Sequence, residues 1–379
     1  MSTFEAFGLP KSVQKAIDEL GYTNPTPIQE KSFPVVMSGR DMMGIAQTGT
    51  GKTLAYLLPL LKLYKFSHTH TPKILILVPT RELVVQVAEE VEKLTQYMSV
   101  RTLGIYGGVN INTQKTAVYQ GVDILVGTPG RVMDLALDNV VRFDDTTKLV
   151  IDEFDEMLNL GFRPQLTSIL AMMRPKRQNI LFSATMTDEV DAVLNDFFDF
   201  PEEVSLAPSG TPIEKIAQLA YPVANFNTKI NLLKHLLKDE SMSRVLIFVN
   251  NKRLADLIFE GIEEDFGHEF GLIHSNKSQN YRLSTMAEFQ LGNLRGIITT
   301  DVMARGLDIS DITHVINFEM PELPETYIHR IGRTGRASNA GSAFSLVAET
   351  EQHHFSVIEK KMKKKVERIE TNDLDLLSF

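Results

Sequence analysis

The segment Ala46-Gln47-Thr48-Gly49-Thr50-Gly51-Lys52-Thr53 decides the fold of this chain. An apolar run that is typical of a strand precedes it (Asp41 to Ile45), and an apolar run that is typical of a helix follows it (Leu54 to Leu63). A glycine loop between a strand and a helix presents several backbone N–H groups to one small volume, and the helix N-terminus adds the positive end of its dipole. The segment therefore predicts an anion site that favours polyphosphate.

The side chains of this loop indicate how phosphate would be held. Lys52 can reach the β- and γ-phosphates, and the Thr53 hydroxyl can bind Mg²⁺. The residues before them would surround the phosphates: Thr48, Gly49, Thr50 and Gly51. The generic pattern begins with glycine, whereas this loop begins with Ala46, but the glycines nearest Lys52 are present. The alternative is an ordinary glycine turn without a ligand.

The composition is that of a globular protein with room for two domains. The chain has 379 residues, of which 43% are hydrophobic and 23% are charged, and a chain of this length usually divides into two cores. It has no cysteine, which excludes disulfides and cysteine–zinc sites. No apolar run approaches membrane-spanning length and no secretory signal is evident, so we expect a cytoplasmic protein. The net charge of −9 argues against a generally basic nucleic-acid coat protein but leaves room for a local basic groove.

Further apolar runs predict a parallel sheet around the loop. Short continuous apolar runs between helical stretches are typical of βαβ units whose sheet is covered on both faces. Four such runs follow the loop: Ile74 to Val78, Ile124 to Val126, Lys148 to Ile151 and Asn179 to Phe182. In such a sheet, ligand residues lie just past the carboxyl ends of the strands. The polar tails of these runs therefore predict a site: Pro79 to Leu83, Thr128 to Arg131, Asp152 to Asp155 and Ser183 to Thr185.

A stretch rich in turn residues around Pro201 to Pro212 marks a domain boundary. We expect an N-terminal domain over residues 1–206, a linker over 207–213 and a C-terminal domain over 214–379. Beyond the linker, apolar runs such as Val245 to Val249 again alternate with helical stretches, but no second glycine-Lys-Thr loop occurs. The expected fold class is α/β, with two doubly wound parallel-sheet domains that share one nucleotide.

The C-terminal run from Glu351 to Glu370 is predicted to be helical. It contains five lysines between Lys360 and Lys365. Such a cluster is usually a solvated helix face, and nucleic-acid binding is the alternative.

An aromatic ring and an amide before the loop suggest a base pocket. Tyr22 and Gln29 flank two prolines that rigidify a turn, Pro25 and Pro27. Tyr22 could stack on a purine, and the Gln29 amide could offer one donor and one acceptor to the N6 and N7 edge of adenine. The alternative is a proline-rich connector with a buried tyrosine.

Acidic and basic residues supply the remaining chemistry. Asp152 follows an apolar strand and is suited to hold Mg²⁺ through water, while Glu153 can orient or deprotonate an attacking water. The segment His329 to Arg336 contains three arginines spaced by glycines, and arginines in a core are unfavourable without anions. Delivered across a cleft, they would place positive charge at a γ-phosphate and make hydrolysis depend on domain closure; a loop that binds a phosphate backbone is the alternative. Asp308 is suited to a ribose hydroxyl, or else it caps a helix or turn.

Taken in order, these motifs resemble those of the DEAD-box RNA helicases of superfamily 2 over nearly the whole chain. The matching segments are Phe4, Tyr22 and Gln29 (the adenine-selecting Q motif), Ala46 to Thr53, Pro79 to Leu83, Gly107-Gly108, Thr128 to Arg131, Asp152 to Asp155, Ser183 to Thr185, Phe248, Gln279, Arg282, Thr300-Asp301, Arg305 to Asp308, and His329 to Arg336. Any one of these is a modest signal, but all of them in order leave little room for chance. The resemblance implies two RecA-like domains joined by a flexible linker, ATP and Mg²⁺ as cofactors, and RNA as the partner.

The resemblance also implies a role for each matching residue. The adenosine part of ATP would be bound by Phe4, Tyr22, Gln29 and Asp308. Catalysis would rest on Lys52, Asp152, Glu153, Arg333 and Arg336, with Thr53 and Asp152 at the Mg²⁺. The RNA backbone would meet Arg81, Gly108, Thr128, Arg131 and Thr300, and coupling would involve Ser183, Thr185, His329 and Arg330. Because such contacts go to phosphates and sugars, RNA binding should be largely independent of sequence.

One residue departs from the family pattern. Phe154 stands where the family has alanine, so the motif reads Asp-Glu-Phe-Asp. The three carboxylates remain, so we still expect hydrolysis. A phenyl ring adds volume next to the Ser183 to Thr185 motif, and close-packed interiors respond to such additions. We expect neighbours that have adjusted to the ring, and altered coupling is the alternative.

The mechanism that the resemblance implies is a cycle of closure around RNA. ATP and single-stranded RNA would close the two domains, one strand would bend against a wedge at Val132 to Leu137, and a short duplex would separate locally. A DNA translocase would share the loop and the arginines but gives no reason for Tyr22 and Gln29. An ATP-gated RNA clamp, which would need little unwinding, is a further alternative. A metal-dependent nuclease would need a dense carboxylate cluster, and the sequence has none beyond Asp152 to Glu156. By resemblance alone, we expect a monomer acting on ribosomal RNA or pre-ribosomal particles, in ribosome assembly or cold adaptation.

Overall fold

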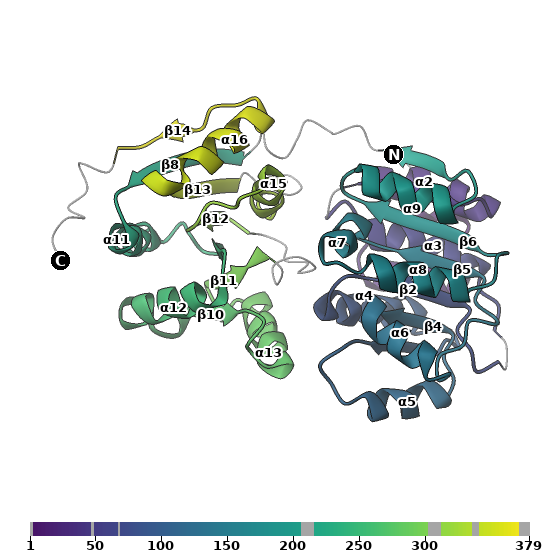
Figure 1. The fold of residues 1–379 in the computed structure, drawn as a ribbon. Coiled ribbons are helices and arrows are strands. Elements are labelled where there is room, and N and C mark those ends of the chain that lie inside the picture. The colour runs from purple at the N-terminus through teal and green to yellow at the C-terminus, as the bar shows by residue number, and fades with distance from the viewer. Residues whose placement is uncertain are drawn as a thin grey trace. The chain divides into compact units, whose positions relative to one another are not determined.

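The chain forms two compact units, Met1–Ala207 and Pro208–Phe379. The computed structural model describes residues 3–46, 49–66, 69–205, 216–301, 312–335 and 341–370. Each unit is built on a parallel sheet of seven strands, with helices on both faces of the sheet (Figure 1). The expected α/β fold class with two doubly wound sheets is therefore confirmed. The linker expected over 207–213 lies outside the described residues.

In the first unit, strands and helices alternate along the chain. The strands are β1 (Met42–Ile45), β2 (Ile74–Leu77), β3 (Thr102–Ile105), β4 (Ile124–Gly127), β5 (Lys148–Ile151), β6 (Gln178–Ser183) and β7 (Glu202–Ser205). The helices are η1 (Phe4–Phe7), α1 (Lys11–Glu19), α2 (Pro27–Ser38), α3 (Lys52–Leu63), α4 (Arg81–Thr95), α5 (Ile111–Tyr119), α6 (Pro129–Leu137), α7 (Phe154–Asn159), α8 (Arg163–Met172) and α9 (Asp188–Phe197). The strand order across the sheet is β3-β4-β2-β5-β6-β1-β7.

The sheet of the first unit is buried on both faces, as its continuous apolar strands predict. In β2, Ile74 and Ile76 pack into a core with α2, α3 and α4, while Leu75 and Leu77 pack into a second core with α6, α7 and α8. Successive side chains of a strand point to opposite faces, so one run of four apolar residues serves both cores. Each fully buried side chain of this size contributes about 1.5–3 kcal/mol to the hydrophobic free energy of folding.

The second unit repeats this architecture. Its strands are β8 (Ile216–Val223), β9 (Val245–Val249), β10 (Phe270–Ile273), β11 (Gly296–Thr300), β12 (His314–Asn317), β13 (Gly341–Ala348) and β14 (Glu367–Arg368). Its helices are α11 (Phe226–Leu237), α12 (Lys252–Phe266), η2 (Gly267–Glu269), α13 (Gln279–Gln290), α15 (Pro324–Ile331), η3 (Glu349–Glu351) and α16 (Gln352–Met362). The strand order β10-β11-β9-β12-β13-β8-β14 is that of the first sheet when its strands are counted from β8. The two units are therefore structural repeats.

The helix predicted from Glu351 to Glu370 is wrong beyond Met362, where α16 ends. Lys363 takes a left-handed backbone conformation (φ 53°), and the chain returns as β14, which pairs in parallel with β8. The buried Glu359 carboxylate holds this turn, because it accepts hydrogen bonds from the Val366 backbone N–H at 2.9 Å and from the Arg368 guanidinium at 3.1 Å. The sequence pattern missed a tertiary contact that outweighs helix propensity.

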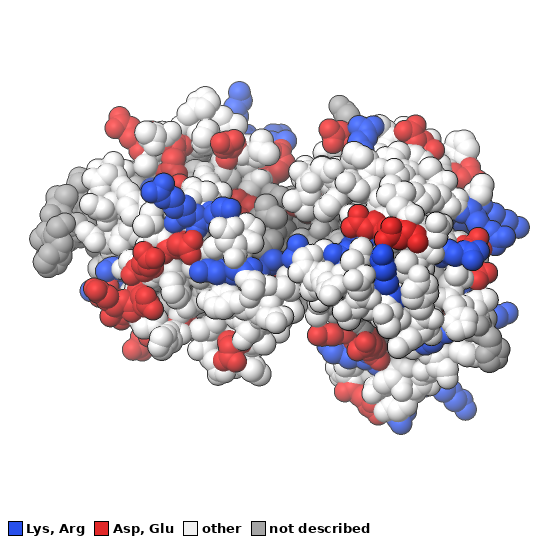
Figure 2. All heavy atoms as spheres, turned by 60° about the horizontal axis from the view of Figure 1, so that its bottom comes forward, with Lys and Arg blue, Asp and Glu red and all other residues white. Residues whose placement is uncertain are grey.

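The surface carries both signs of charge. On the face shown in Figure 2, basic and acidic side chains are interspersed over the described parts of both units. Within the described ranges, the structure contains no helix whose length and apolar character would let it cross a membrane.

Candidate nucleotide and RNA sites

The strand order of the first sheet sorts the predicted motifs into two groups. The tails of β5, β6 and β1 are neighbours and carry the acidic pair, the Ser183 to Thr185 motif and the phosphate loop. The tails of β3, β4 and β2 are also neighbours and carry Gly108, Thr128 and Arg81. Backbone hydrogen bonds extend the sheet into these tails, as from Ala46 N to Ser183 O at 3.0 Å and from Asp152 N to Leu77 O at 3.0 Å. The residues that the sequence predicts to bind nucleotide and those that it predicts to bind RNA thus share one edge of the sheet in this unit.

The phosphate loop has the backbone that its glycines predict. Gly49 and Gly51 have φ angles of 80° and 90°, a region that favours glycine. A β-carbon at Gly51 would lie 2.5 Å from the Gln29 amide nitrogen, so a larger residue would also displace the Gln29 amide from this position. Helix α3 begins at Lys52 and has no acidic residue in its first turn, which leaves the positive end of its dipole available to an anion. Thr48 lies outside the described residues.

Lys52 and Asp152 form a buried ion pair behind the loop. The Lys52 Nζ is 3.4 Å from Asp152 Oδ1, and the two side chains are 6% and 4% exposed. Burial acts to lower the pKa of Lys52, but the carboxylates of Asp152 and Glu153 act against it, and the pKa of Lys52 is raised above its ordinary value. The ammonium group therefore stays charged. Together with the Thr53 hydroxyl and the oxygen ligands of Asp152, it fits a polyphosphate with bound Mg²⁺, a cation that prefers oxygen.

The acidic pair occupies an unusual backbone turn. Glu153 has a φ angle of 54°, in the left-handed region that few non-glycine residues adopt, and it precedes the first residue of α7. The Asp152 carboxylate accepts a hydrogen bond from the Glu153 backbone N–H at 2.9 Å, which supports this turn. Such backbone strain is common at functional sites, where it fixes a side chain in a required direction. Glu153 is 9% exposed, so its carboxylate lies largely out of water.

Asp155 links the acidic motif to the Ser183 to Thr185 motif. Its Oδ2 accepts hydrogen bonds from the Thr185 backbone N–H at 3.0 Å and from the Thr185 hydroxyl at 2.8 Å. The Ser183 hydroxyl donates to the Thr185 carbonyl at 2.7 Å. The sequence reading counted Asp155 as a carboxylate without giving it a role. Its position just after the carboxyl end of an apolar strand was the available signal that it lies at the same edge of the sheet.

Phe154 is a core residue of the first unit. Its side chain is 0% exposed and lies in the hydrophobic core that includes Met157 of α7 and Leu181 of β6. The ring therefore points into the sheet-facing core, on the helix that also carries Asp155.

We expect Phe154→Ala to lower the free energy of unfolding of the first unit by about 3–5 kcal/mol, because it leaves a cavity in a packed core. At temperatures where the variant stays folded, ATP affinity should be nearly unchanged and RNA-stimulated turnover should change by less than about tenfold, or 1.4 kcal/mol. Thermal denaturation followed by circular dichroism and ATPase assays measure the two effects. Phe154→Leu, which keeps most of the volume, serves as the control with a smaller loss of stability. A larger loss of turnover in the folded variant would show that coupling needs the ring.

The three residues predicted to form the base pocket differ in their exposure to solvent and in their contacts. The Gln29 Oε1 accepts a hydrogen bond from the Thr26 backbone N–H at 2.9 Å, and its Nε2 donates to the Gly51 carbonyl at 3.1 Å. The amide thus caps α2 and contacts the phosphate loop, and it keeps one N–H and one lone pair for a base. Tyr22 is 40% exposed, while Phe4 is 3% exposed and packs edge-on against Phe7 with ring centroids 5.9 Å apart. The structure therefore exposes the Tyr22 ring and buries the Phe4 ring.

The RNA-backbone motifs of the first unit lie against one another. The guanidinium of Arg81 covers Gly108, where a β-carbon would lie only 2.0 Å from Nη1. Arg131 is 9% exposed, and it donates to Gln114 Oε1 at 3.0 Å and to the Val109 carbonyl at 3.2 Å. Arg131 therefore supports the loop that carries Gly108, a contact with Gln114 that the sequence reading missed. Thr128 is buried at the N-terminus of α6.

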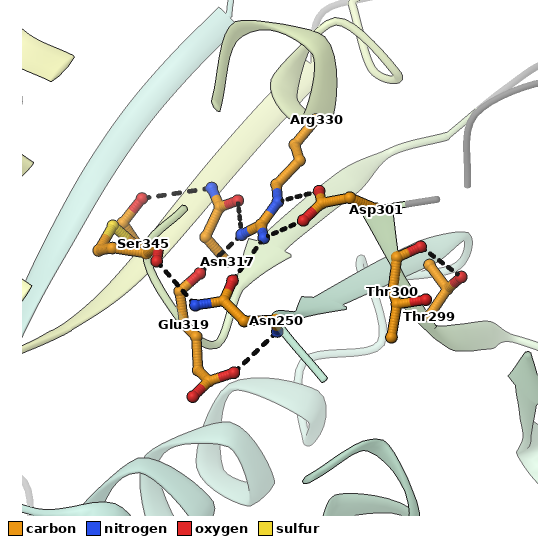
Figure 3. A network of polar contacts seen from close by, with 9 residues as sticks. Asn250, Thr299, Thr300, Asp301, Asn317, Glu319, Arg330 and Ser345 are labelled. Carbon is orange, nitrogen blue, oxygen red and sulfur yellow. Dashed lines mark hydrogen bonds and ion pairs between the residues drawn. The ribbon is translucent and has the colours of Figure 1, made fainter. Parts of the chain in front are cut away.

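Arg330 of the second unit is enclosed by hydrogen-bond acceptors (Figure 3). Its Nε and Nη2 donate to the two Asp301 carboxylate oxygens at 2.5 and 2.7 Å. Nη2 also donates to Asn250 Oδ1 at 2.8 Å, and Nη1 donates to the Glu319 carbonyl at 2.6 Å and to Asn317 Oδ1 at 3.3 Å. A guanidinium has five N–H groups, so every donor of Arg330 has a partner within the unit. The network joins the carboxyl ends of β9, β11 and β12.

This network changes the interpretation of the arginine segment. Arg330 is 1% exposed and Arg333 is 6% exposed, so both side chains are buried in this structure. The sequence predicts that the arginines of this segment need anions. For Arg330 the structure supplies the Asp301 carboxylate, which follows Thr300 at the end of β11. His329 is half-buried in the last turn of α15. Asp308 and Arg336 lie outside the described residues.

Comparisons with known proteins show the family of this chain. Residues 26–193 match the DEAD/DEAH box helicase family, and residues 228–338 match the helicase conserved C-terminal domain. The DEAD-box ATP-dependent RNA helicase CshA of Geobacillus kaustophilus is 38% identical over 99% of this chain and 80% of its own length. The enzyme of the same name from Bacillus subtilis is 37% identical over 98% of this chain and 75% of its own.

A solved structure extends the likeness to the fold. The structure of Dbp5 from S. cerevisiae bound to RNA and ADP BeF3 has a TM-score of 0.89 at 29% identity, and the match covers 99% of this chain and 97% of that one. A DEAD box protein from Methanococcus jannaschii is 33% identical with a TM-score of 0.55, over 97% of this chain and 99% of that one. The motifs, their order on the two sheets and these relatives lead to one conclusion: the chain belongs to the DEAD-box ATP-dependent RNA helicases.

Proposed function

We propose that this protein is an RNA-stimulated ATPase that closes around RNA and locally unwinds short duplexes or remodels RNA–protein complexes. The observation that carries the proposal is the shared sheet edge of the first unit. There the phosphate loop and the acidic pair lie in the same row as Arg81 and Gly108. The contact between Asp155 and Thr185 joins the acidic motif to the next strand tail. An arrangement of this kind lets a change at the nucleotide be passed to the RNA residues.

We assign the chemistry of hydrolysis to the loop and the acidic pair. Thr48, Gly49, Thr50, Gly51 and Lys52 would hold the phosphates, and Thr53 with Asp152 would hold Mg²⁺. The cation would neutralise negative charge on the β- and γ-phosphate oxygens. Glu153 would orient the attacking water and accept its proton, a task that its fixed, largely buried position suits. Tyr22 would stack on adenine, the remaining Gln29 donor and acceptor would read it, Phe4 would support the pocket, and Asp308 would bind the ribose.

The second unit would complete the reaction and the RNA path. Arg333 and Arg336 would approach the γ-phosphate when the protein closes, and His329 would couple this movement to hydrolysis. Arg330 would act in coupling through Asp301 and Asn250, because its own donors are engaged. RNA would run along Thr300 here and along Arg81, Gly108, Thr128 and Arg131 of the first unit. We retain 1–206, 207–213 and 214–379 as proposed limits of the first domain, linker and second domain.

The cellular role is proposed from the resemblance to bacterial relatives. We place the protein in the cytoplasm, as a monomer, with ribosomal RNA or pre-ribosomal particles as its targets. Ribosome assembly and cold adaptation are the processes that would use such an activity. Crosslinking the protein to cellular RNA and sequencing the bound fragments would identify the target.

The test of the proposed function is a comparison of RNA with DNA. We expect single-stranded RNA to stimulate ATP hydrolysis at least about tenfold more than DNA of the same sequence, equivalent to about 1.4 kcal/mol. The reason is that contacts to the 2′-hydroxyl distinguish RNA from DNA at a backbone site. Lys52→Ala serves as the control for contaminating ATPases, since it removes the buried ammonium from the phosphate loop. Equal stimulation by DNA would favour the translocase alternative and overturn the assignment.

A further inference from the structure

A pocket opens at the amino ends of β2 and β5, whereas the phosphate loop and the acidic pair follow the carboxyl ends of their strands. Its volume is about 400 Å³, which is in the range of pockets that hold small molecules. Helix α3 runs from Lys52, at the phosphate loop, to Leu63, which lines this pocket. A helix of 12 residues is about 18 Å long, so the pocket and the phosphate loop are separate sites.

Lysines outnumber carboxylates in the lining of this pocket. Lys65, Lys73 and Lys148 line it together with one acidic residue, Asp145. The Asp145 carboxylate accepts a hydrogen bond from the Thr71 hydroxyl. In the part of the chain that the structure describes, none of the three lysines forms an ion pair. The pocket therefore carries an excess of positive charge.

An anchored amide positions Lys148 in the pocket. The Lys148 Nζ donates to Gln178 Oε1 at 2.6 Å, and Gln178 Nε2 donates to the carbonyls of Val36 and Arg40 at 3.0 and 2.6 Å. Burial lowers the pKa of Lys148, and no carboxylate of the described residues acts against this effect. A bound anion would stabilise the charged form of the ammonium, which has two further N–H groups to donate.

The other walls of the pocket suit the apolar part of an organic molecule. Leu60, Leu63 and Ile74 supply apolar surface. Tyr64 supplies an aromatic ring, and the Lys73 Nζ lies 5.4 Å from its centroid. Small-molecule sites commonly combine such apolar walls with a few polar groups that fix the orientation of the ligand.

We propose that this pocket is a second ligand site of the first unit and binds a small organic phosphate. The phosphate contacts Lys65, Lys73 and Lys148, because ammonium groups bind phosphate as point charges. The apolar part of the ligand packs against the C-terminal end of α3. The inference does not rest on the proposed function, because the pocket shares no residue with the phosphate loop or the acidic pair.

The site is tested with 1-naphthyl phosphate, whose binding to the full chain is followed by fluorescence anisotropy, since the chain has no tryptophan. We expect a dissociation constant below about 1 mM. Inorganic phosphate and 1-naphthol, which each lack one part of the ligand, should bind at least about tenfold more weakly. Saturating ADP with Mg²⁺ should change the affinity for 1-naphthyl phosphate by less than about twofold, because the phosphate loop is at the other end of α3.

Three variants locate the binding. Lys148→Met keeps most of the side-chain length without the ammonium and should weaken binding of 1-naphthyl phosphate about tenfold, the usual effect of losing a hydrogen bond to a charged group. Lys65→Gln should weaken it about threefold; because Lys65 is exposed, this variant should keep the melting temperature of the wild type and tests the site even if Lys148→Met folds poorly. Lys93→Gln, at an exposed position of α4, is the matched control and should bind as the wild type does.

Four results would overturn the inference. The wild type could show no binding of 1-naphthyl phosphate up to about 1 mM. ADP could displace the compound, which would place it in the phosphate loop. Inorganic phosphate could bind equally well, which would leave the apolar walls without a role. Lys65→Gln and Lys148→Met could bind the compound as tightly as Lys93→Gln does, which would place it outside this pocket.

Discussion

Glu153→Gln is expected to lower RNA-stimulated ATP turnover by about 10²- to 10⁴-fold, the usual contribution of a positioned general base. Glutamine has nearly the same shape as glutamate but cannot accept the proton of the attacking water. It can occupy the same left-handed position at φ 54°, and the hydrogen bond from its backbone N–H to Asp152 remains. Stability and the affinity for ATP should therefore change little. Single-turnover hydrolysis and equilibrium binding of ATP measure the two quantities separately.

Glu156→Gln is the control for this experiment. Glu156 is also a buried carboxylate of α7, but it has no place in the proposed chemistry. Its substitution should leave turnover within about threefold, a change below 1 kcal/mol. Equal losses of turnover in both variants would show that turnover depends on the total negative charge at this end of α7. Glu153 would then have no special role in hydrolysis.

The same Glu153→Gln variant distinguishes a helicase from an RNA clamp. If the protein acts by unwinding, a variant that binds ATP and RNA without hydrolysis should fail to replace the wild type in cells. If the protein acts as an ATP-gated clamp, the variant should still support growth. Survival of the cells would thus contradict the unwinding role while leaving the ATP site intact.

The sequence predicts the positions of the site residues better than it predicts their partners. Strands in a parallel sheet end at one edge, so the polar tails after Ile151 and Phe182 could be placed together from the pattern of apolar runs alone. The strand order, which brings Asp155 against Thr185, depends on packing between distant segments. No spacing rule indicates that Arg131 donates to Gln114 or that Arg330 binds Asp301.

Two further differences have the same physical origin. The Gln29 amide was expected to await a base, but it also caps α2 and contacts the loop at Gly51, because a buried amide satisfies its hydrogen bonds locally. The helix expected to run to Glu370 ends at Met362, where Glu359 binds the returning chain. In both cases a hydrogen bond between separate segments decided the structure, and the local sequence pattern does not reveal such a bond.

Arg330→Met is expected to destabilise the second unit by about 3–5 kcal/mol, the usual loss when one partner of a buried ion pair is removed. Methionine keeps most of the side-chain volume but none of the five donors. The Asp301 carboxylate, which is 21% exposed, and the side-chain oxygen of Asn250 would lose their partner. Because the chain has no tryptophan, unfolding of the full protein is best followed by circular dichroism and calorimetry. Arg330→Lys should recover only part of the loss, because an ammonium cannot make the paired contact with Asp301.

A double variant separates the buried charge from the other lost contacts. With Asp301→Asn added to Arg330→Met, no carboxylate is left without its partner, so the combined loss should be smaller than the sum of the single losses by about 1–2 kcal/mol. Arg253→Met, at an exposed position of α12, should change stability by less than about 0.5 kcal/mol and controls for the loss of an arginine as such. Additive losses would show that Asp301 and Arg330 contribute independently. A coupling of this size would show that Arg330 stabilises the second unit through Asp301, as part of the network that holds the ends of β9, β11 and β12 together.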